Sequence, residues 1–284
     1  MFLRVFDPWK GKLCTCSKKY SLSPYTGCEH QCRYCYITTY IPRAFECRAK
    51  DNFIKYLPKE LAKADPKYPI SIANSSDPYP PKELELGITH KMLKLFQNYD
   101  FKILLVTKSD IVTRDIELLK QLNVVVTMTI TTDDPVLASR LEPNAPEPDA
   151  RVEAVGSLIR NNIPTMVRID PIIPGVNEDP TRLVEMLSET GLTTITSSTY
   201  KARPDSLKRM VASFPEHNAQ FEELYSKNAE FINRARYLSQ DKRYEMMKKI
   251  RDIATDLGME FGMCREGFPD LQTSKSCDGT HLFL

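Results

Sequence analysis

Three cysteines, Cys28, Cys32 and Cys35, lie in one short segment of the chain with the pattern C-x3-C-x2-C. Thiolates at this spacing can bind three irons of one cubane iron–sulfur cluster, which ordinarily takes four protein thiolates. The remaining iron then keeps an open coordination position, and such a position distinguishes a catalytic metal centre from a structural one. The motif therefore predicts a [4Fe–4S] cluster with a catalytic role.

The alternative metal for this motif is zinc, because C-x2-C pairs are common zinc ligands and His30 lies inside the motif as a fourth donor. A zinc ribbon, however, usually needs a second cysteine pair a short distance away. Here the motif follows a short predicted strand and opens an α/β chain, which favours the cluster. A non-catalytic, zinc-binding protein associated with nucleic acid stays open as the alternative. Such a protein would retain zinc after aerobic purification and show no brown colour.

The other five cysteines lie towards the two ends of the chain, at Cys14, Cys16, Cys47, Cys264 and Cys277. Four of them, all except Cys47, suffice to close a second metal site, either an auxiliary [4Fe–4S] cluster or a structural zinc. Such a site would hold the two ends of the chain together. The alternative is that they are buried free thiols, which pack as small hydrophobic side chains. Cys47 has no partner pattern and is predicted to be structural.

The composition excludes some classes of protein. The 284 residues include 39 basic and 37 acidic side chains, for a formal net charge of +2, so the chain lacks the strong positive charge typical of nucleic-acid binders. No apolar run approaches the roughly 18 residues that span a bilayer, and no cleavable leader is recognisable at the start. We therefore expect a cytoplasmic protein that is not bound to a membrane. In that reducing compartment, cysteines are more often metal ligands or catalytic thiols than disulfides.

Short apolar runs alternate with amphipathic stretches after the cysteine-rich opening. The predicted strands are Tyr20–Ser23, Ile70–Asn74, Phe101–Thr107, Asn123–Thr129, Thr165–Asp170 and Thr193–Ser198. The predicted helices are Glu83–Asn98, Thr113–Gln121, Asp149–Asn161 and Pro180–Thr190. Several of the strands are continuous runs of Val, Ile and Leu, as expected of parallel strands covered on both faces.

This alternation predicts an α/β fold with a parallel sheet and crossover helices. Six βα units are too few to close an eight-fold barrel, so we predict a partial (β/α)6 TIM-like barrel with its chemistry at the carboxyl ends of the strands. Residues 1–200 would form this barrel with its cysteine-rich N-terminal segment. Residues 201–284 would form a C-terminal helical appendage with a cysteine-containing tail. Its predicted elements are helices His217–Arg236 and Asp241–Gly258 and a short strand Met259–Met263.

The cysteine motif, with the aromatic residue Tyr34 directly before its last cysteine, resembles that of the radical S-adenosylmethionine (SAM) superfamily. The resemblance implies that the open iron chelates the amino and carboxylate groups of SAM. An electron from the cluster then cleaves the sulfonium to give a 5′-deoxyadenosyl radical, which removes a hydrogen atom from the substrate. The resemblance also implies oxygen sensitivity, an electron donor such as ferredoxin or flavodoxin, and a position for Tyr34 beside the adenine.

Other segments resemble the spore-photoproduct-lyase-like branch of this superfamily. They are Pro24-Tyr25-Thr26-Gly27-Cys28, Asn74-Ser75-Ser76-Asp77-Pro78-Tyr79, Thr107-Lys108-Ser109 and Thr113-Arg114-Asp115. By this resemblance, Ser76 contacts SAM after the second strand. Lys108, at the end of the third strand, pairs with the SAM carboxylate, which is a suitable role for a point cation. The alternative for Lys108 is a solvated lysine in a loop.

The segment after the fifth strand, Pro171-Ile172-Ile173-Pro174-Gly175-Val176-Asn177-Glu178, is similar to the superfamily pattern G-x-I-x-G-x-x-E. Ile173, Gly175 and Glu178 fit this pattern, whereas Pro171 replaces its first glycine. The resemblance places the backbone of Ile173 and Gly175 beside the adenine. Arg140-Leu141-Glu142-Pro143 and Arg168 also resemble residues of the branch. They are either active-site charges or ion pairs inside the barrel.

The resemblance does not extend to the substrate. Spore photoproduct lyase returns a hydrogen atom to DNA from a cysteine just before its Ser/Thr-Ser-Asp stretch, and Asn74 occupies that position here. No cysteine occurs between Cys47 and Cys264, although Cys264 or Cys277 can replace that thiol from another direction. The low net charge also weakens the case for DNA. The substrate stays open between a nucleic-acid base, a peptide side chain and a small molecule, with DNA-lesion repair as the branch-specific alternative.

Overall fold

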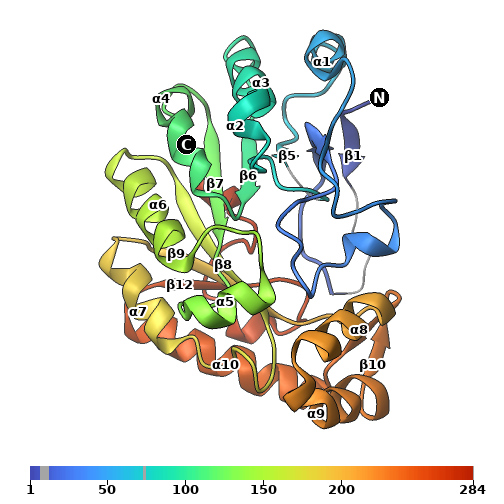
Figure 1. Ribbon diagram of the computed structural model, residues 1–284. Coiled ribbons are helices and arrows are strands. Elements are labelled where there is room, and N and C mark those ends of the chain that lie inside the picture. The colour runs from blue at the N-terminus through green and yellow to red at the C-terminus, as the bar shows by residue number, and fades with distance from the viewer. Residues whose placement is uncertain (7–12, 73–74, 284) are drawn as a thin grey trace.

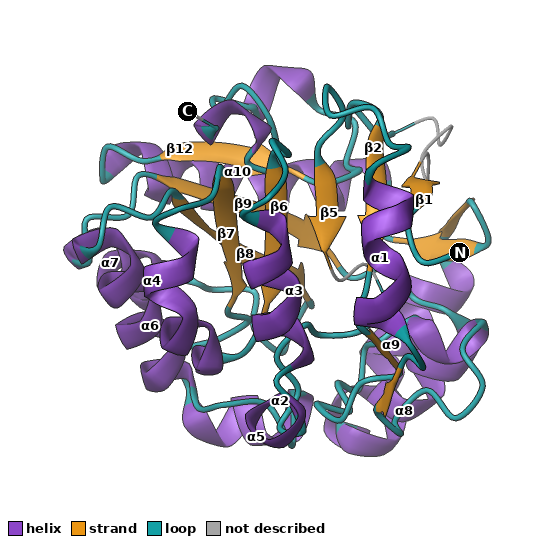
Figure 2. Cartoon of the chain, turned by 90° about the horizontal axis from the view of Figure 1, so that it is seen from above, coloured by secondary structure: helices purple, strands orange, loops and turns teal. Residues whose placement is uncertain are grey.

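A largely parallel β-sheet forms the centre of the molecule (Figure 2). The computed structural model describes residues 1–6, 13–72 and 75–283, and its eight-stranded sheet has the order β1-β2-β5-β6-β7-β8-β9-β12. β1 is antiparallel to β2, and every other neighbouring pair is parallel. These strands are β1 (Arg4–Phe6), β2 (Lys19–Leu22), β5 (Ile70–Ile72), β6 (Ile103–Thr107), β7 (Val124–Thr129), β8 (Thr165–Ile172), β9 (Thr194–Thr199) and β12 (Glu260–Met263).

Helices follow one another around the outside of these strands (Figure 1). They are α1 (Phe53–Leu61), α3 (Ile88–Phe96), α4 (Ile116–Leu119), α6 (Pro148–Arg160), α7 (Thr181–Glu189) and α10 (Gln240–Asp256). All six residues of β7 are buried, as expected of a parallel strand covered on both faces. A short strand pair, β3 (Tyr25–Thr26) and β4 (Arg48–Ala49), flanks the cysteine motif. Among the residues that the structure describes, no helix is long and apolar enough to cross a bilayer.

The sheet confirms the predicted α/β architecture. The six predicted strands correspond to β2, β5, β6, β7, β8 and β9, although Asn74, the predicted end of one of them, lies outside the described residues. The strand predicted in the C-terminal part is β12, and it joins the same sheet, because Phe261 is opposite Ile195 of β9 in a parallel pair. It therefore adds one more parallel strand to the predicted six. The division of the chain near residue 200 remains a prediction.

The predicted helix Glu83–Asn98 is divided in the structure into α2 (Glu83–Leu86) and α3. Gly87 between them has a left-handed φ of 59°, which interrupts the helical backbone. The segment predicted as one helix therefore forms two. The helices predicted before β8, before β9 and before β12 are present as α6, α7 and α10.

The predicted helix His217–Arg236 is correct only in its first half. Only α9 (Asn218–Glu222) and a short π-helical turn after it are helical, and a hairpin of β10 (Glu230–Ile232) and β11 (Ala235–Tyr237) follows. The two residues of its turn, Asn233-Arg234, both have positive φ, as a type I′ hairpin turn requires. This hairpin could not be predicted from the sequence, because its turn lacks the glycine that usually marks such a turn.

Candidate active site

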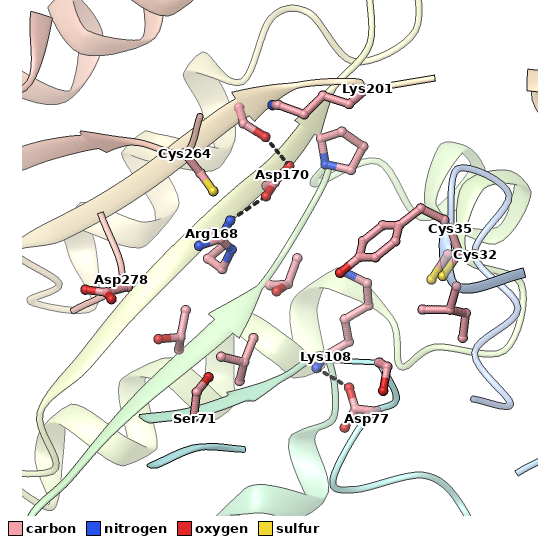
Figure 3. Close-up of a pocket in the computed structure, with 18 of the residues that line it drawn as sticks. Cys32, Cys35, Ser71, Asp77, Lys108, Arg168, Asp170, Lys201, Cys264 and Asp278 are labelled. Carbon is pink, nitrogen blue, oxygen red and sulfur yellow. Dashed lines mark hydrogen bonds and ion pairs between the residues drawn. The ribbon is translucent and has the colours of Figure 1, made fainter. Parts of the chain in front are cut away.

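The carboxyl ends of the parallel strands surround a cavity of about 330 Å³. Figure 3 shows Cys32 and Cys35 on one side of this cavity, with Arg168 and Asp170 in its middle. The lining also includes Cys28, Tyr34, Ser76, Asp77 and Lys108. Most of the residues that the sequence singled out for chemistry thus gather at the edge of the sheet where parallel α/β folds bind ligands.

Backbone hydrogen bonds hold the loop that carries the three cysteines. Gly27, directly before this loop, has a left-handed φ of 75°, and the Cys28 N–H donates to the Ala44 carbonyl at 2.8 Å. Farther along, the Arg33 N–H donates to the Leu141 carbonyl at 2.8 Å. Leu141 is the last residue of α5 (Pro135–Leu141). The loop is therefore anchored on both sides of its middle cysteine.

We expect Gly27→Ala to disrupt this loop. An added Cβ would lie 2.2 Å from the Glu46 carbonyl oxygen, and the left-handed conformation costs any other L-residue about 1–2 kcal/mol. The backbone must shift, so the melting temperature and the iron taken up on reconstitution should both fall. Gly258→Ala is the matched control, because Gly258 has a φ of 73° and an added Cβ there meets nothing within 4 Å. Equal losses in the two variants would contradict the steric explanation.

Arg209 braces the cysteine loop from the distant helix α8 (Pro204–Ser213). Its guanidinium donates to the Arg33 carbonyl at 3.1 Å, to the Cys35 carbonyl at 2.5 Å and to Thr38 Oγ1 at 3.0 Å. Asp205 accepts from the same guanidinium at 3.2 Å. No signal in the cysteine motif pointed to this contact, because Arg209 lies far from the motif along the chain.

We expect Arg209→Gln to loosen the cysteine loop. A hydrogen bond from a charged donor contributes about 1.5–3 kcal/mol, and Arg209 makes three of them to this loop. The reconstituted variant should lose iron to a chelator several times faster than the wild type. Lys208→Gln is the control, since it removes the same charge from the exposed neighbouring position. Iron release at the wild-type rate from Arg209→Gln would argue against the brace.

Asp77 links the segment after β5 to the end of β6. Its carboxylate accepts hydrogen bonds from Thr107 Oγ1 at 2.6 Å, from the Lys108 N–H at 2.8 Å and from the Tyr79 N–H at 2.9 Å. His30 Nε2 of the cysteine loop lies 3.6 Å from the same carboxylate. Asp77 therefore orders several segments of the cavity wall, a role that its place in the sequence did not reveal.

Lys108 belongs to a buried charge network centred on Glu142. Its Nζ lies 3.3 Å from Glu142 Oε1, while Arg151 Nη1 lies 2.5 Å from Glu142 Oε2, and the Tyr34 hydroxyl also donates to this carboxylate. Burial by itself would raise the pKa of Glu142, but Lys108, Arg151 and the hydrogen bonds lower it to about 2. Glu142 is thus ionised at neutral pH. With 15% of its side chain exposed, Lys108 is a paired cation and not a solvated loop lysine.

A second charge network lies on the wall formed by β8 and β9. Arg168 Nη2 is 2.6 Å from Asp170 Oδ2, and Ser198 Oγ donates to Asp170 at 2.6 Å. Lys201 Nζ lies 2.8 Å from Glu266 Oε1. Burial would raise the pKa of Asp170, but Arg168 and Lys201 hold it below its usual range. Carboxylates of the chain itself therefore neutralise these cations.

A family comparison agrees with this arrangement of cysteine loop, parallel strands and cavity. Residues 22–187 match the model of the Radical SAM superfamily. The chain belongs to this superfamily. The matched range contains the three cysteines together with β5, β6, β7 and β8. Membership of this superfamily implies a [4Fe–4S] cluster and SAM as cofactors.

Individual relatives extend the comparison. The uncharacterized protein MJ0683 of Methanocaldococcus jannaschii is 31% identical over 171 residues, which cover 55% of this chain and 61% of that protein. The uncharacterized protein ORF301 of Acidianus two-tailed virus is 29% identical over 181 residues, which cover 57% of this chain and 59% of that protein. A mutant of spore photoproduct lyase superposes with a TM-score of 0.67 at 16% identity, covering 91% of this chain and 80% of that chain. The structural likeness concerns the fold, and the sequence matches span less than two thirds of each curated relative.

The residues predicted to bind cofactors divide into two groups in this member of the radical SAM superfamily. Tyr34, Ser76 and Lys108 line the cavity with the three cysteines. Ile173 and Gly175, both within the described range, do not line it. The Ile173 N–H instead donates to Asn177 Oδ1 at 2.7 Å, so this pattern shapes a turn after β8.

The residues present fit an iron–sulfur cluster at the cysteine loop. His30 lines the cavity and is 2% exposed, yet neither of its ring nitrogens has a hydrogen-bond partner within the described structure, whereas buried polar groups nearly always have one. Burial raises the pKa of Cys32 to about 12, so this thiol stays protonated until a metal displaces its proton. Within the described ranges, no three His, Cys, Asp or Glu side chains surround a single ion position. A cluster does not require this, because each thiolate binds a different iron.

Proposed function

We propose that this radical SAM enzyme binds its [4Fe–4S] cluster through Cys28, Cys32 and Cys35 and cleaves SAM reductively. The observation that supports this most directly is the position of the three motif cysteines on the wall of one cavity at the strand ends. When bound, the cluster would supply the electron that cleaves SAM into methionine and a 5′-deoxyadenosyl radical. A reduced carrier such as a ferredoxin or flavodoxin would provide that electron.

The chain's own residues would bind and orient SAM. An ammonium group has three donors, and the ion pair with Glu142 uses one donor of Lys108. The others can bind the SAM carboxylate. Glu142, which is itself paired with Arg151, holds Lys108 and the Tyr34 hydroxyl in place. Ser76 faces the same cavity and supplies a further hydroxyl for SAM.

The charges of the cavity argue against binding of a polyanion inside it. Lys108, Arg168 and Lys201 are each paired with a carboxylate of the chain, at 3.3, 2.6 and 2.8 Å. A nucleic-acid backbone is bound by cations that contact its phosphates, and carboxylates of the chain already offset the positive charge of these three. We therefore propose that a base, a peptide side chain or a small molecule with little net charge enters the cavity.

Anaerobic turnover tests the proposed function. The protein is reconstituted with iron and sulfide, reduced and given SAM, and 5′-deoxyadenosine is then quantified. Product that depends on both the reductant and SAM supports the proposal, whereas a full cluster without product, with or without candidate substrates, contradicts it. DNA carrying the spore photoproduct is one such substrate. Repaired thymines would favour the lesion-repair alternative, and unaltered lesions would count against it.

We expect Lys108→Gln to weaken SAM binding while the cluster remains. Losing a charge-assisted hydrogen bond worth about 1.5–3 kcal/mol lowers affinity roughly 10- to 100-fold. Equilibrium binding of SAM to the reconstituted protein measures this change, and the iron content confirms that the cluster is intact. Lys120→Gln, which removes an outer lysine paired with Glu117, should bind SAM normally. Wild-type affinity in Lys108→Gln would refute the proposed contact.

A further inference from the structure

Four cysteines outside the cluster motif meet in the structure although they come from opposite ends of the chain. We call Cys14, Cys16, Cys264 and Cys277 the four-thiol group. Cys14, Cys16 and Cys264 line the same cavity. Cys277 lies against β12 near Cys264, because its Cα is 3.1 Å from the position of a Cβ added to Gly262. Cys16 interacts with Cys14 and Cys277, and Cys277 also interacts with Cys264. All four are free cysteines, so each thiol is available as a ligand.

The four-thiol group lies between two parts of the sheet that are not paired with each other. Its first two members precede β2, whereas Cys264 directly follows β12, and these strands are not neighbours in the sheet. Lys19 of β2 forms a salt bridge with Asp278 of the C-terminal tail, which joins the same two parts. Figure 3 shows Cys264 and Asp278 on the side of the cavity away from Cys32. The group is therefore placed where it can tie the two parts together.

Cations surround the four-thiol group. Lys19, Arg168 and Arg265 line the cavity together with three members of the group, Cys14, Cys16 and Cys264. A divalent ion with four thiolates carries two net negative charges, and burying such a charge is costly unless cations compensate it. These cations, two of which also pair with Asp278 and Asp170, would offset part of that charge.

We propose that the four-thiol group binds one Zn²⁺ in a closed, structural site that joins β2 to the C-terminal part of the sheet. Tetrahedral zinc holds four thiolates at about 2.3 Å, which places the sulfurs about 3.8 Å apart, so it suits thiols that are direct neighbours of one another. The thiolates of a cubane bind four separate irons and therefore lie farther apart. The described side chains do not yet surround one ion position. Zinc binding must therefore turn the thiols inward and release their protons.

Metal analysis of the full chain tests this site. Wild-type protein expressed with zinc and then treated with EDTA should retain about one zinc ion per chain. The double variant Cys264→Ser/Cys277→Ser should lose this zinc but still take up iron at the cysteine loop. Cys47→Ser is the matched control, because Cys47 is also buried but lies outside the group, and it should keep the zinc. A strong zinc chelator should lower the melting temperature of the wild type and leave that of the double variant unchanged.

Two results would overturn the proposal. The first is a wild-type chain without zinc whose four-thiol group reacts freely with a thiol reagent under native conditions. The second is iron in place of zinc, with about half of the total iron lost in the double variant, which would reveal a second cluster. If the double variant does not fold, the reactivity of the wild-type thiols still tests the proposal. Zinc-bound thiols should react with the thiol reagent only after the chelator is added. Neither readout depends on SAM cleavage, so this proposal and the proposed function can fail separately.

Discussion

Cys32→Ala is expected to lower the production of 5′-deoxyadenosine by more than about 100-fold. Even the loss of a residue that only supports a metal ligand lowers metal affinity or activity about 10- to 100-fold. Cys32 is the middle cysteine of the motif, 6% exposed and on the wall of the cavity. Without it, the loop offers two thiolates to a cluster that needs at least three. The variant should therefore take up little iron and lack the brown colour of the reconstituted wild type.

Cys47→Ala controls for the loss of a buried thiol near the same loop. Cys47 is 2% exposed, but it does not line the cavity. This variant should reconstitute with wild-type iron content and retain most of its activity. An active Cys32→Ala variant, or iron loss of equal size in both variants, would show that the cluster has other ligands.

Glu142→Ala is expected to lower the free energy of unfolding by about 3–5 kcal/mol, the usual cost of breaking a buried ion pair from one side. Arg151, which is 1% exposed, would lose its carboxylate partner at 2.5 Å. Chemical denaturation measures the loss. Glu153→Ala is the matched control, because Glu153 pairs with Arg160 at 2.6 Å on the surface, where ion pairs contribute about 0–1 kcal/mol. Comparable losses of unfolding free energy in the two variants would show that burial does not make the Glu142 pair more important for stability.

The same carboxylate makes stability depend on pH in the acid range. Despite burial, Lys108 and Arg151 lower the pKa of Glu142 from 4.5 to about 2. A carboxyl group whose pKa is lower in the folded state contributes stability that is full above its unfolded pKa and is lost as the pH falls through its folded pKa. The difference corresponds to about 3 kcal/mol. Between about pH 5 and pH 2, the free energy of unfolding should therefore fall less for Glu142→Gln than for the wild type.

The cysteine motif and the main strands could be predicted because both depend on residues close together in the chain. The spacing of Cys28, Cys32 and Cys35 lets one loop carry three thiols. Continuous apolar runs such as Val124–Thr129 predict strands buried on both faces. Family membership and the α/β fold were predicted correctly on this local information. The contacts assigned to Ser76 and Lys108 with SAM remain proposals.

Contacts between distant segments could be identified only in the folded structure. The position of Glu142 between Lys108 and Arg151 depends on how the segment after α5 packs against α6 and β6. The brace from Arg209 depends on where α8 docks.

The sequence by itself determined the enzyme superfamily, the parallel architecture and the cysteines available for metals. The tertiary structure alone decided that β12 completes the sheet beside β9 and that Lys19 and Asp278, from opposite ends of the chain, form a salt bridge. The physical reason is that spacing along the chain constrains a loop or a strand. Approach of the two chain ends, in contrast, depends on the packing of every element between them.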